Sequence, residues 1–250
     1  MPHFFIDSNN VTGNTVTICD KDNYNHIVKS LRAKLGENLL LIDENSVQYE
    51  TVIKEITPNS IVADISNQYQ SARKLDFELY LAQSPLRNSD AQVFLIEKAT
   101  ELGVSGVYPI YTDNCALAKS VIEKKIDKWQ RIMYESSKQC ERADIPVCFN
   151  MTEIQKLLDE VKFDKIIAFC ERIAKKSLHE FSSETPVKKG EKVLIIIGPE
   201  GGFSEREFEY FAANPQVAML TLGNLILRAE TAVTVALGNV IYEFENNKQN

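Results

Sequence analysis

The sequence predicts an α/β protein in which a parallel β-sheet covered by helices follows a smaller, strand-rich domain. Two observations support this fold class. In the later part of the chain, continuous apolar runs such as 166–169 and 193–197 alternate with segments of helical spacing, a pattern typical of a parallel sheet buried on both faces. The earlier part holds short β-prone runs between turn formers. The polar stretch 68–74 separates the two patterns, which predicts domains 1–72 and 73–250.

The first domain is expected to be a small β-barrel or sandwich. Turn formers such as Asn9-Asn10 and Pro58-Asn59-Ser60 keep its β-prone runs short. One short helix, at 23–31, interrupts these runs. The predicted strands are Phe4–Ile6, Val16–Ile18, Leu39–Ile42, Val47–Ile53 and Ile61–Ile65.

The second domain alternates strands with helices. Its predicted strands are Phe77–Ala82, Val107–Tyr111, Ile166–Phe169, Val193–Ile197 and Val217–Leu222. Its main predicted helices are Ser89–Leu102, Ile122 to about Arg142, and Leu225–Phe244. In the second of these helices, apolar residues recur at helical spacing, which is typical of a face buried in the core or in a dimer contact. These residues are Ile122, Ile126, Trp129 and Met133.

The composition is that of an ordinary soluble protein. The 250 residues are 44% hydrophobic and 25% charged, which is enough to bury a core. No apolar run approaches the roughly 20 residues of a membrane span, and we expect no signal peptide. The net charge of −7 argues against a protein that coats nucleic acid by bulk electrostatics, but it is compatible with RNA binding through a local basic face.

The cysteines predict neither disulfides nor a metal site. They are odd in number and scattered, none forms a C-x-x-C pair, and histidine is too scarce to complete a zinc site. They stand at Cys19, Cys115, Cys140, Cys148 and Cys170. We therefore expect free thiols, a reducing cytoplasm and no bound metal.

The most informative segment is 193–207, in which a buried strand runs into the glycine-rich stretch Gly198–Gly202. Ligands of open α/β sheets bind beyond the carboxyl ends of strands, so this stretch is well placed to bind one. Its glycines allow close backbone approach or positive φ. Ser204 and Glu207 fit a capping box that begins a helix. The segment lacks the pattern of a P-loop, and a tight turn without a ligand is the alternative.

A second segment, 220–232, has the same layout. A predicted strand ends at Gly223, and Arg228, Glu230 and Thr231 stand in the first turns of an otherwise apolar helix. Charged groups placed there need partners or a ligand. The alternatives are a solvated face or an ion pair between Arg228 and Glu230, which the i, i+2 spacing disfavours.

Four motifs follow one another in order over much of the chain. They are Glu97–Val104, Gln139–Arg142 with Pro146, Gly198–Ser204 with Glu207, and Leu222-Gly223 with Ile226–Ala232. Together they resemble the RsmE family of SPOUT-class RNA methyltransferases. In the first domain, His26, Leu31-Arg32 and Gly36 resemble the PUA-like RNA-binding domain of that family. The resemblance covers nearly the whole chain.

This resemblance implies a SPOUT-type parallel sheet with a C-terminal trefoil knot, preceded by a small PUA-like β-barrel domain. It also implies S-adenosylmethionine as the cofactor and a homodimer with the site at the subunit interface. The knot loops would hold the cofactor, largely through backbone groups. The residues implied to bind it are Ile197, Gly198, Pro199, Glu200, Gly201, Gly202, Leu222, Gly223, Ile226, Leu227 and Thr231.

The implied reaction is methylation of N3 of a specific uridine in 16S ribosomal RNA. Neutral N3 carries a proton and is a poor nucleophile, so catalysis must favour loss of this proton and align the nitrogen with the methyl group. Arg228 is the candidate for stabilising negative charge on the uracil oxygens. Glu200 or Glu230 could accept the proton or orient Arg228, and the sequence does not choose between them.

Local basic residues are the candidate RNA contacts. Those chosen from the first domain and from the motif segments are His26, Lys29, Arg32, Arg87, Lys98 and Arg142. A further basic stretch contains Lys124, Lys125, Lys128 and Arg131, of which Lys124 and Lys125 are more simply a solvated helix face. The target uridine should leave its stack to reach the cofactor.

Two alternatives remain open at this stage. One is another SPOUT activity, methylation of a ribose 2′-OH or of a transfer RNA base; Arg142 and the PUA-like domain favour the ribosomal uridine instead. The other is a non-catalytic RNA-binding protein of the same fold. The intact segments Gly198–Gly202 and Arg228–Thr231 speak against this second alternative.

Overall fold

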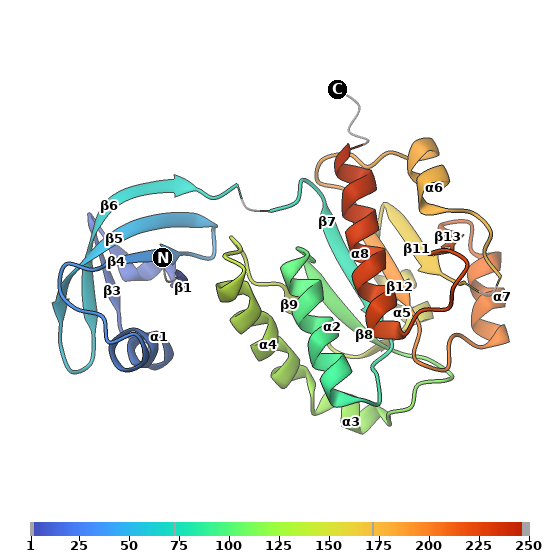
Figure 1. Ribbon diagram of the computed structural model, residues 1–250, viewed down its shortest axis with the longest axis horizontal. Coiled ribbons are helices and arrows are strands. Elements are labelled where there is room, and N and C mark those ends of the chain that lie inside the picture. Colours follow the sequence, from blue (N-terminus) through green and yellow to red (C-terminus); the bar gives the residue numbers. More distant parts are fainter. Residues whose placement is uncertain (1–2, 73, 172, 247–250) are drawn as a thin grey trace. The chain divides into compact units, whose positions relative to one another are not determined.

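The computed structural model describes residues 3–72, 74–171 and 173–246, which form two compact units (Figure 1). Unit 1 is Met1–Lys74 together with Ser137–Asp144, and unit 2 is Leu75–Ser136 together with Ile145–Asn250. The predicted boundary at 72/73 places residues 137–144 in the second domain, whereas the contacts of this segment group it with unit 1. Such long-range contacts leave no local sequence signal.

Unit 1 is built on a six-stranded sheet with the order β1-β4-β5-β6-β3-β2. Its strands are β1 (His3–Phe5), β2 (Val11–Thr12), β3 (Thr15–Ile18), β4 (Asn38–Ile42), β5 (Val47–Ile56) and β6 (Ile61–Gln70). β1 is parallel to β4, and the other pairs are antiparallel. Strand residues such as Val16, Leu41 and Ile61 are fully buried in one apolar cluster, which is the core of this unit.

Two predictions for unit 1 are wrong in detail. The expected helix at 23–31 is two short pieces, α1 (Lys21–Asn25) and the π-helix η2 (His26–Ser30). The expected linker at 68–74 begins inside β6, which continues to Gln70 because its last residues pair with β5. The side chains of this part of β6 are exposed, which explains why a polar sequence forms a strand there. A 3-10 turn, η1 (Ser8–Asn10), precedes β2.

Unit 2 contains a seven-stranded sheet with the order β10-β8-β7-β12-β11-β13, in which β9 also pairs with β8 and every pair is parallel. The strands are β7 (Glu78–Gln83), β8 (Gly106–Tyr111), β9 (Val147–Cys148), β10 (Thr152–Glu153), β11 (Lys165–Phe169), β12 (Lys192–Ile197) and β13 (Val217–Leu220). The helices are α2 (Ser89–Glu101), α3 (Lys119–Glu123), α4 (Ile126–Gln139), α5 (Ile154–Glu160), α6 (Leu178–Glu184), α7 (Glu205–Ala213) and α8 (Ala229–Asn246). The predicted α/β fold with a parallel sheet is confirmed.

Helices cover both faces of this sheet, as Figure 1 shows. Successive residues of a strand point to opposite faces. In β12, Val193, Ile195 and Ile197 therefore pack in a cluster with residues of α2, α3, α4, α6 and α8. Leu194 and Ile196 pack in another cluster with residues of α5 and α7. Burial on both faces explains the unbroken apolar run of this strand.

The helix expected from Ile122 to Arg142 is two helices, α3 and α4, with a break at Lys124-Lys125. α4 ends at Gln139, and Glu141 follows with a φ of 57°, in the left-handed region common just after helices. The apolar positions of the two helices nevertheless lie in the core as predicted. The buried ones are Ile122, Trp129 and Met133.

The helix expected at 225–244 begins later, at Ala229. Residues 225–228 form a non-helical loop between β13 and α8. The pair Leu225-Ile226 is 76% and 73% exposed, and the carbonyl of Arg228 accepts a helical hydrogen bond of 2.7 Å. Arg228 therefore stands immediately before the helix and not within it. Among the described helices, none combines the length and apolarity needed to cross a bilayer.

Candidate functional site

A pocket of about 510 Å³ lies at one edge of the parallel sheet of unit 2. β11, β12 and β13 are parallel neighbours in the sheet, so their carboxyl ends share this edge, where ligands of such sheets bind. The volume lies within the roughly 300–1,000 Å³ of small-molecule sites. The lining residues are Asn88, Ala91, Phe169–Glu171, Ile197–Phe203, Phe208, Ile226–Glu230 and Ala232.

The structure brings most of the predicted cofactor-binding residues to this one pocket. Those that line it are Ile197, Gly198, Pro199, Glu200, Gly201, Gly202, Ile226 and Leu227. Leu222, Gly223 and Thr231 are not among its lining residues. Thr231 is exposed on α8, because one residue along a helix rotates a side chain by about 100° away from its neighbour. We call Gly198–Ser204 the glycine loop and Thr221–Arg228 the arginine loop.

The local sequence accounts for the shape of the glycine loop. Gly202 has a φ of 71°, a conformation that favours glycine. A Cβ at Gly201 would lie 3.2 Å from the Cβ of Asn114, so this glycine permits close packing. The predicted capping box is present: the Ser204 hydroxyl accepts from the N–H of Glu207 (3.3 Å), and the Glu207 carboxylate accepts from the N–H of Ser204 (2.8 Å).

Residues that follow β8 hold the glycine loop in place. The side-chain amide of Asn114 donates to the Gly202 carbonyl (3.1 Å). The Asp113 carboxylate accepts from the Ser204 hydroxyl and from the guanidinium of Arg206, whose Nε lies 3.1 Å away. The hydrogen bond from Arg206 has the larger effect and that from Ser204 the smaller, and together they hold the pKa of Asp113 below its ordinary value. The glycine loop is thus fixed by the protein's own contacts.

Glu200, a candidate proton acceptor, is tied to the loop that follows β7. Its Oε1 accepts from the backbone N–H of Arg87 (2.9 Å). That loop is anchored by two buried amides: the side chain of Gln92 accepts from the N–H of Leu86 (2.8 Å) and donates to Oε1 of Gln83 (3.1 Å). The two glutamines are only 3% and 1% exposed. Part of the hydrogen-bonding capacity of Glu200 therefore serves loop geometry.

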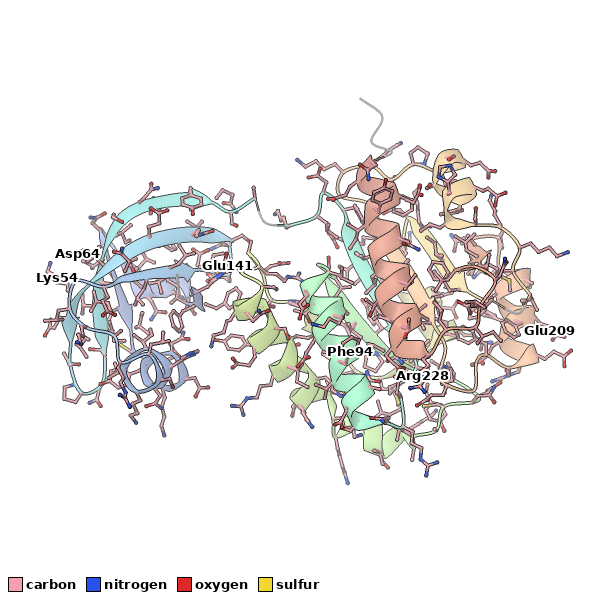
Figure 2. All side chains as sticks on the ribbon, in the orientation of Figure 1. Lys54, Asp64, Phe94, Glu141, Glu209 and Arg228 are labelled. Carbon is pink, nitrogen blue, oxygen red and sulfur yellow. The ribbon has the colours of Figure 1, made fainter. Side chains whose placement is uncertain are left out.

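Arg228 and Glu230 both line the pocket at the beginning of α8, and Figure 2 shows Arg228 at this end of the helix. Arg228 is exposed and Glu230 is half-buried. Within the described part of the chain, Arg228 forms no ion pair, so the pairing with Glu230 that we considered from the sequence is absent. Its five N–H donors are available to a bound group.

Several lining residues were not predicted from the sequence. They are Asn88, Ala91, Phe169, Cys170, Glu171, Phe203, Phe208, Ala229 and Ala232. A sequence rule could have found those after β11, because ligand contacts are expected wherever a parallel strand ends at its carboxyl edge.

Burial, and then the charge of Glu171, raise the pKa of the Cys170 thiol to about 12. This thiol therefore stays protonated near neutral pH.

The candidate RNA contacts of unit 1 lie at or near the helical segment between β3 and β4. Lys29 and Arg32 are exposed, and Arg32 has a φ of 54°. His26 is half-buried, with its ring edge-on to Phe4 at a centroid distance of 5.4 Å. Lys29 and Arg32 are therefore available to a phosphate group, whereas His26 has a packing role as well.

The other candidate RNA contacts differ in availability. Arg87 is exposed. Lys98 forms an ion pair with Glu101 (2.7 Å). Arg142 is 7% exposed and its guanidinium binds the carboxylate of Asp144 (3.0 Å). Arg142 had been assigned to the catalytic domain, yet its contacts group it with unit 1.

Comparison with known proteins defines the class. The model of an RNA methyltransferase domain matches residues 73–241, and the model of an RNA methyltransferase PUA domain matches residues 18–66. Along the chain, the PUA match precedes the methyltransferase match, and the latter also includes residues 137–144, which belong to unit 1 by their contacts. The fold and the site are therefore those of a PUA-containing RNA methyltransferase.

More particularly, the chain belongs to the family of ribosomal RNA small subunit methyltransferase E. It is 33% identical to that protein of Mesomycoplasma hyopneumoniae over 87% of this chain and 90% of the relative, and 28% identical to that of Bacillus subtilis over 88% and 87%. The crystal structure of the Neisseria gonorrhoeae protein, bound to S-adenosyl methionine, is similar with a TM-score of 0.80, 26% identity and 96% coverage of each chain.

Proposed function

We propose that this protein transfers the methyl group of S-adenosylmethionine to N3 of a specific uridine in 16S ribosomal RNA. The observation that carries the proposal is the pocket between the glycine and arginine loops, lined by most of the predicted cofactor-binding residues in a chain of this family. The relative of known structure from Neisseria gonorrhoeae binds the same cofactor.

The residues of the pocket fit this cofactor. Its volume suits a nucleoside with an attached amino acid. The backbone of Gly198–Gly202 offers amides and carbonyls to an adenine, and apolar side chains such as Leu227 and Phe203 offer contact to its faces. When bound, S-adenosylmethionine supplies an electrophilic methyl group on its sulfonium.

Arg228 is the residue to which we assign charge stabilisation. As the N3 proton leaves, negative charge develops on the uracil oxygens, and a guanidinium beside the pocket can donate to them. Its exposure and its lack of an ion pair within the described chain support this role. Glu230, in the first turn of α8, is the stronger candidate for proton acceptor, because Glu200 already accepts from Arg87.

We further propose that the enzyme is a cytoplasmic homodimer with a C-terminal trefoil knot, and that unit 1 presents Lys29 and Arg32 to RNA. Phosphate contacts of this kind position a substrate without reading its sequence. A pocket shared between two subunits would also cover the exposed apolar pair of the arginine loop, Leu225-Ile226.

Mass-spectrometric mapping of 16S RNA after incubation with the enzyme and methyl-labelled cofactor tests the proposed function. The expected result is one labelled nucleoside, 3-methyluridine, at a single position. Labelled ribose, or label only in transfer RNA, would indicate another SPOUT activity. Cofactor binding without any transfer to RNA, free or in small subunits, would instead indicate a protein that kept the fold and lost the chemistry.

A further inference from the structure

Glu171 is a pocket residue for which neither the sequence motifs nor the proposed reaction gives a role. It follows β11 by two positions and lines the pocket. The turn that carries it is fixed at Cys170, whose carbonyl accepts from the N–H groups of Ile173 (3.1 Å) and Ala174 (2.9 Å). The N–H of Cys170 donates to the carbonyl of Leu220 at the end of β13 (2.9 Å). These hydrogen bonds hold Cys170, the residue before Glu171, at the carboxyl edge of the sheet.

The carboxylate of Glu171 has a buried acceptor atom. Its Oε1 is inaccessible to solvent and finds no hydrogen-bond partner among the described residues. An ionised carboxylate only accepts hydrogen bonds, and an unsatisfied buried acceptor is unfavourable unless a donor reaches it. Glu171 as a whole is half-buried and lines the pocket, so a rotation of its side chain would bring Oε1 to a donor of a bound ligand.

The position of Glu171 relative to the glycine loop indicates which donor it meets. The glycine loop follows β12, and Glu171 follows β11, the strand hydrogen-bonded beside it. In dinucleotide-binding α/β folds, a glycine-rich loop follows one strand and an acidic residue near the neighbouring strand end binds a ribose hydroxyl. The two oxygens of a carboxylate also match the two hydroxyls of a ribose. Glu200, by contrast, is exposed and accepts from Arg87.

We propose that Glu171 is a positioning residue that accepts hydrogen bonds from the ribose hydroxyls of the bound cofactor and so fixes the nucleoside in the pocket. This inference rests on the proposed function, since it requires a nucleoside cofactor. It assigns to Glu171 the recognition of the sugar, while the glycine loop contacts the base.

The test compares variants with ligands that lack one hydroxyl. Wild type, Glu171→Ala and Glu171→Gln would be titrated calorimetrically with S-adenosylhomocysteine and with its 2′-deoxy and 3′-deoxy forms. Glu209→Ala is the matched control, because Glu209 is an exposed glutamate of α7 that does not line the pocket (Figure 2). Melting temperatures of all four proteins report folding.

Hydrogen bonds to a charged group predict that wild type prefers S-adenosylhomocysteine over at least one deoxy form by about ten- to a hundredfold. Glu171→Ala should bind S-adenosylhomocysteine weaker by a similar factor and lose that preference. Glu171→Gln, which keeps one acceptor, should lie between the two. Glu209→Ala should match wild type for all three ligands.

Equal affinity of wild type for all three ligands would overturn the inference, whatever the variants do. So would a folded Glu171→Ala or Glu171→Gln that retains the full preference for the hydroxyls. In both cases cofactor binding, and with it the proposed function, would stand. Failure of wild type to bind either S-adenosylmethionine or S-adenosylhomocysteine would instead overturn the proposed function and the inference together.

Discussion

The two loops that line the pocket differ in how the protein holds them. The glycine loop is held at three of its residues: Glu200 accepts from Arg87, Asn114 donates to Gly202, and Ser204 caps α7. The arginine loop is held at its start. There the N–H of Thr221 donates to the carbonyl of Lys176 (3.1 Å), and the Thr221 hydroxyl donates to the carbonyl of Gly223 and accepts from its N–H. Beyond that, Leu225 and Ile226 point largely into solvent.

This difference suggests a division of labour. A loop fixed by the protein's own hydrogen bonds is preorganised, so a ligand that binds to it loses little free energy in ordering it. A loop with exposed apolar side chains gains stability only when a ligand or another subunit covers it. We expect the glycine loop to set cofactor affinity and the arginine loop to connect cofactor, RNA and partner subunit.

The largest expected effect is that of Arg228→Lys. Lysine keeps the charge but loses the planar fork that holds an oxygen in fixed geometry, and loss of one such donor typically lowers the rate about 10²–10³-fold. Cofactor affinity and melting temperature should change little, because the glycine loop is untouched. Single-turnover methylation of small-subunit RNA, with both other quantities measured on the same preparation, checks this.

A structural arginine would give the opposite pattern, a lower melting temperature with near-normal catalysis in the folded fraction. Turnover within about threefold of wild type, far from the loss expected for a transition-state donor, would remove Arg228 from the chemistry.

Gly202→Val should weaken cofactor binding by at least about tenfold, since a β-branched residue at positive φ strains the loop by roughly 1–3 kcal/mol. Gly190→Val is the matched control: Gly190 has a φ of 81°, also with open space around it, but does not line the pocket. Both variants should lose similar stability, whereas only Gly202→Val should lose affinity in a calorimetric titration. Equal affinities would show that the glycine loop does not bind the cofactor.

A polar substitution at Leu225, an exposed apolar residue of the arginine loop, should weaken the dimer. We expect wild type to be a symmetric homodimer at micromolar concentration. Leu225→Ser should raise the dimer dissociation constant about tenfold, because burying a leucine contributes about 1.5–3 kcal/mol. Leu35→Ser, at a position 63% exposed in unit 1, should have no such effect. A monomeric wild type in light scattering would refute the assembly.

The smallest expected effect is a pH dependence at Asp113. Arg206, and then Ser204, lower the pKa of this carboxyl in the folded state, so the unfolded chain binds more protons in acid. The stabilisation is fully present above the unfolded pKa and is lost as the pH falls below about 4. Because both side chains of the ion pair are accessible, the effect should be small.

Arg206→Gln should reduce this acid sensitivity. Melting temperatures of wild type and variant should therefore differ at neutral pH and converge in acid. A constant difference across the whole pH range would show that Arg206 stabilises the fold by packing and not through the charge of Asp113.

Local chemistry explains what the sequence could predict. The apolar run of β12, the Ser204–Glu207 capping box and the glycine at positive φ are each encoded within a few residues. The predicted beginning of α8 was too early because Leu225-Ile226-Leu227 continues the apolar pattern of the helix. Only the structure shows that the first two of these residues are exposed. Glu171 was missed because no motif marks it, although it follows the end of a parallel strand; its proximity to the glycine loop arises from β12, which is adjacent to β11 in space and distant in sequence.

The basic residues illustrate the same limit. The sequence treats Arg87 and Arg142 alike, as candidate RNA contacts of the second domain. In the structure Arg87 is exposed, whereas Arg142 is buried against Asp144. Burial of a charge depends on partners that approach from elsewhere in the chain, so it cannot be inferred from the charge alone.

Amide hydrogen exchange with and without S-adenosylmethionine is the most direct test of two claims: that the two loops differ in how firmly they are held, and that the cofactor binds in the pocket between them. Without the cofactor, amides of the glycine loop should exchange slowly and those of the arginine loop quickly, because local opening follows hydrogen bonding and burial. A saturating cofactor concentration should slow exchange in both loops, with the larger change in the arginine loop. Equally fast exchange in both loops without the cofactor, or no change in either loop on saturation, would contradict this account.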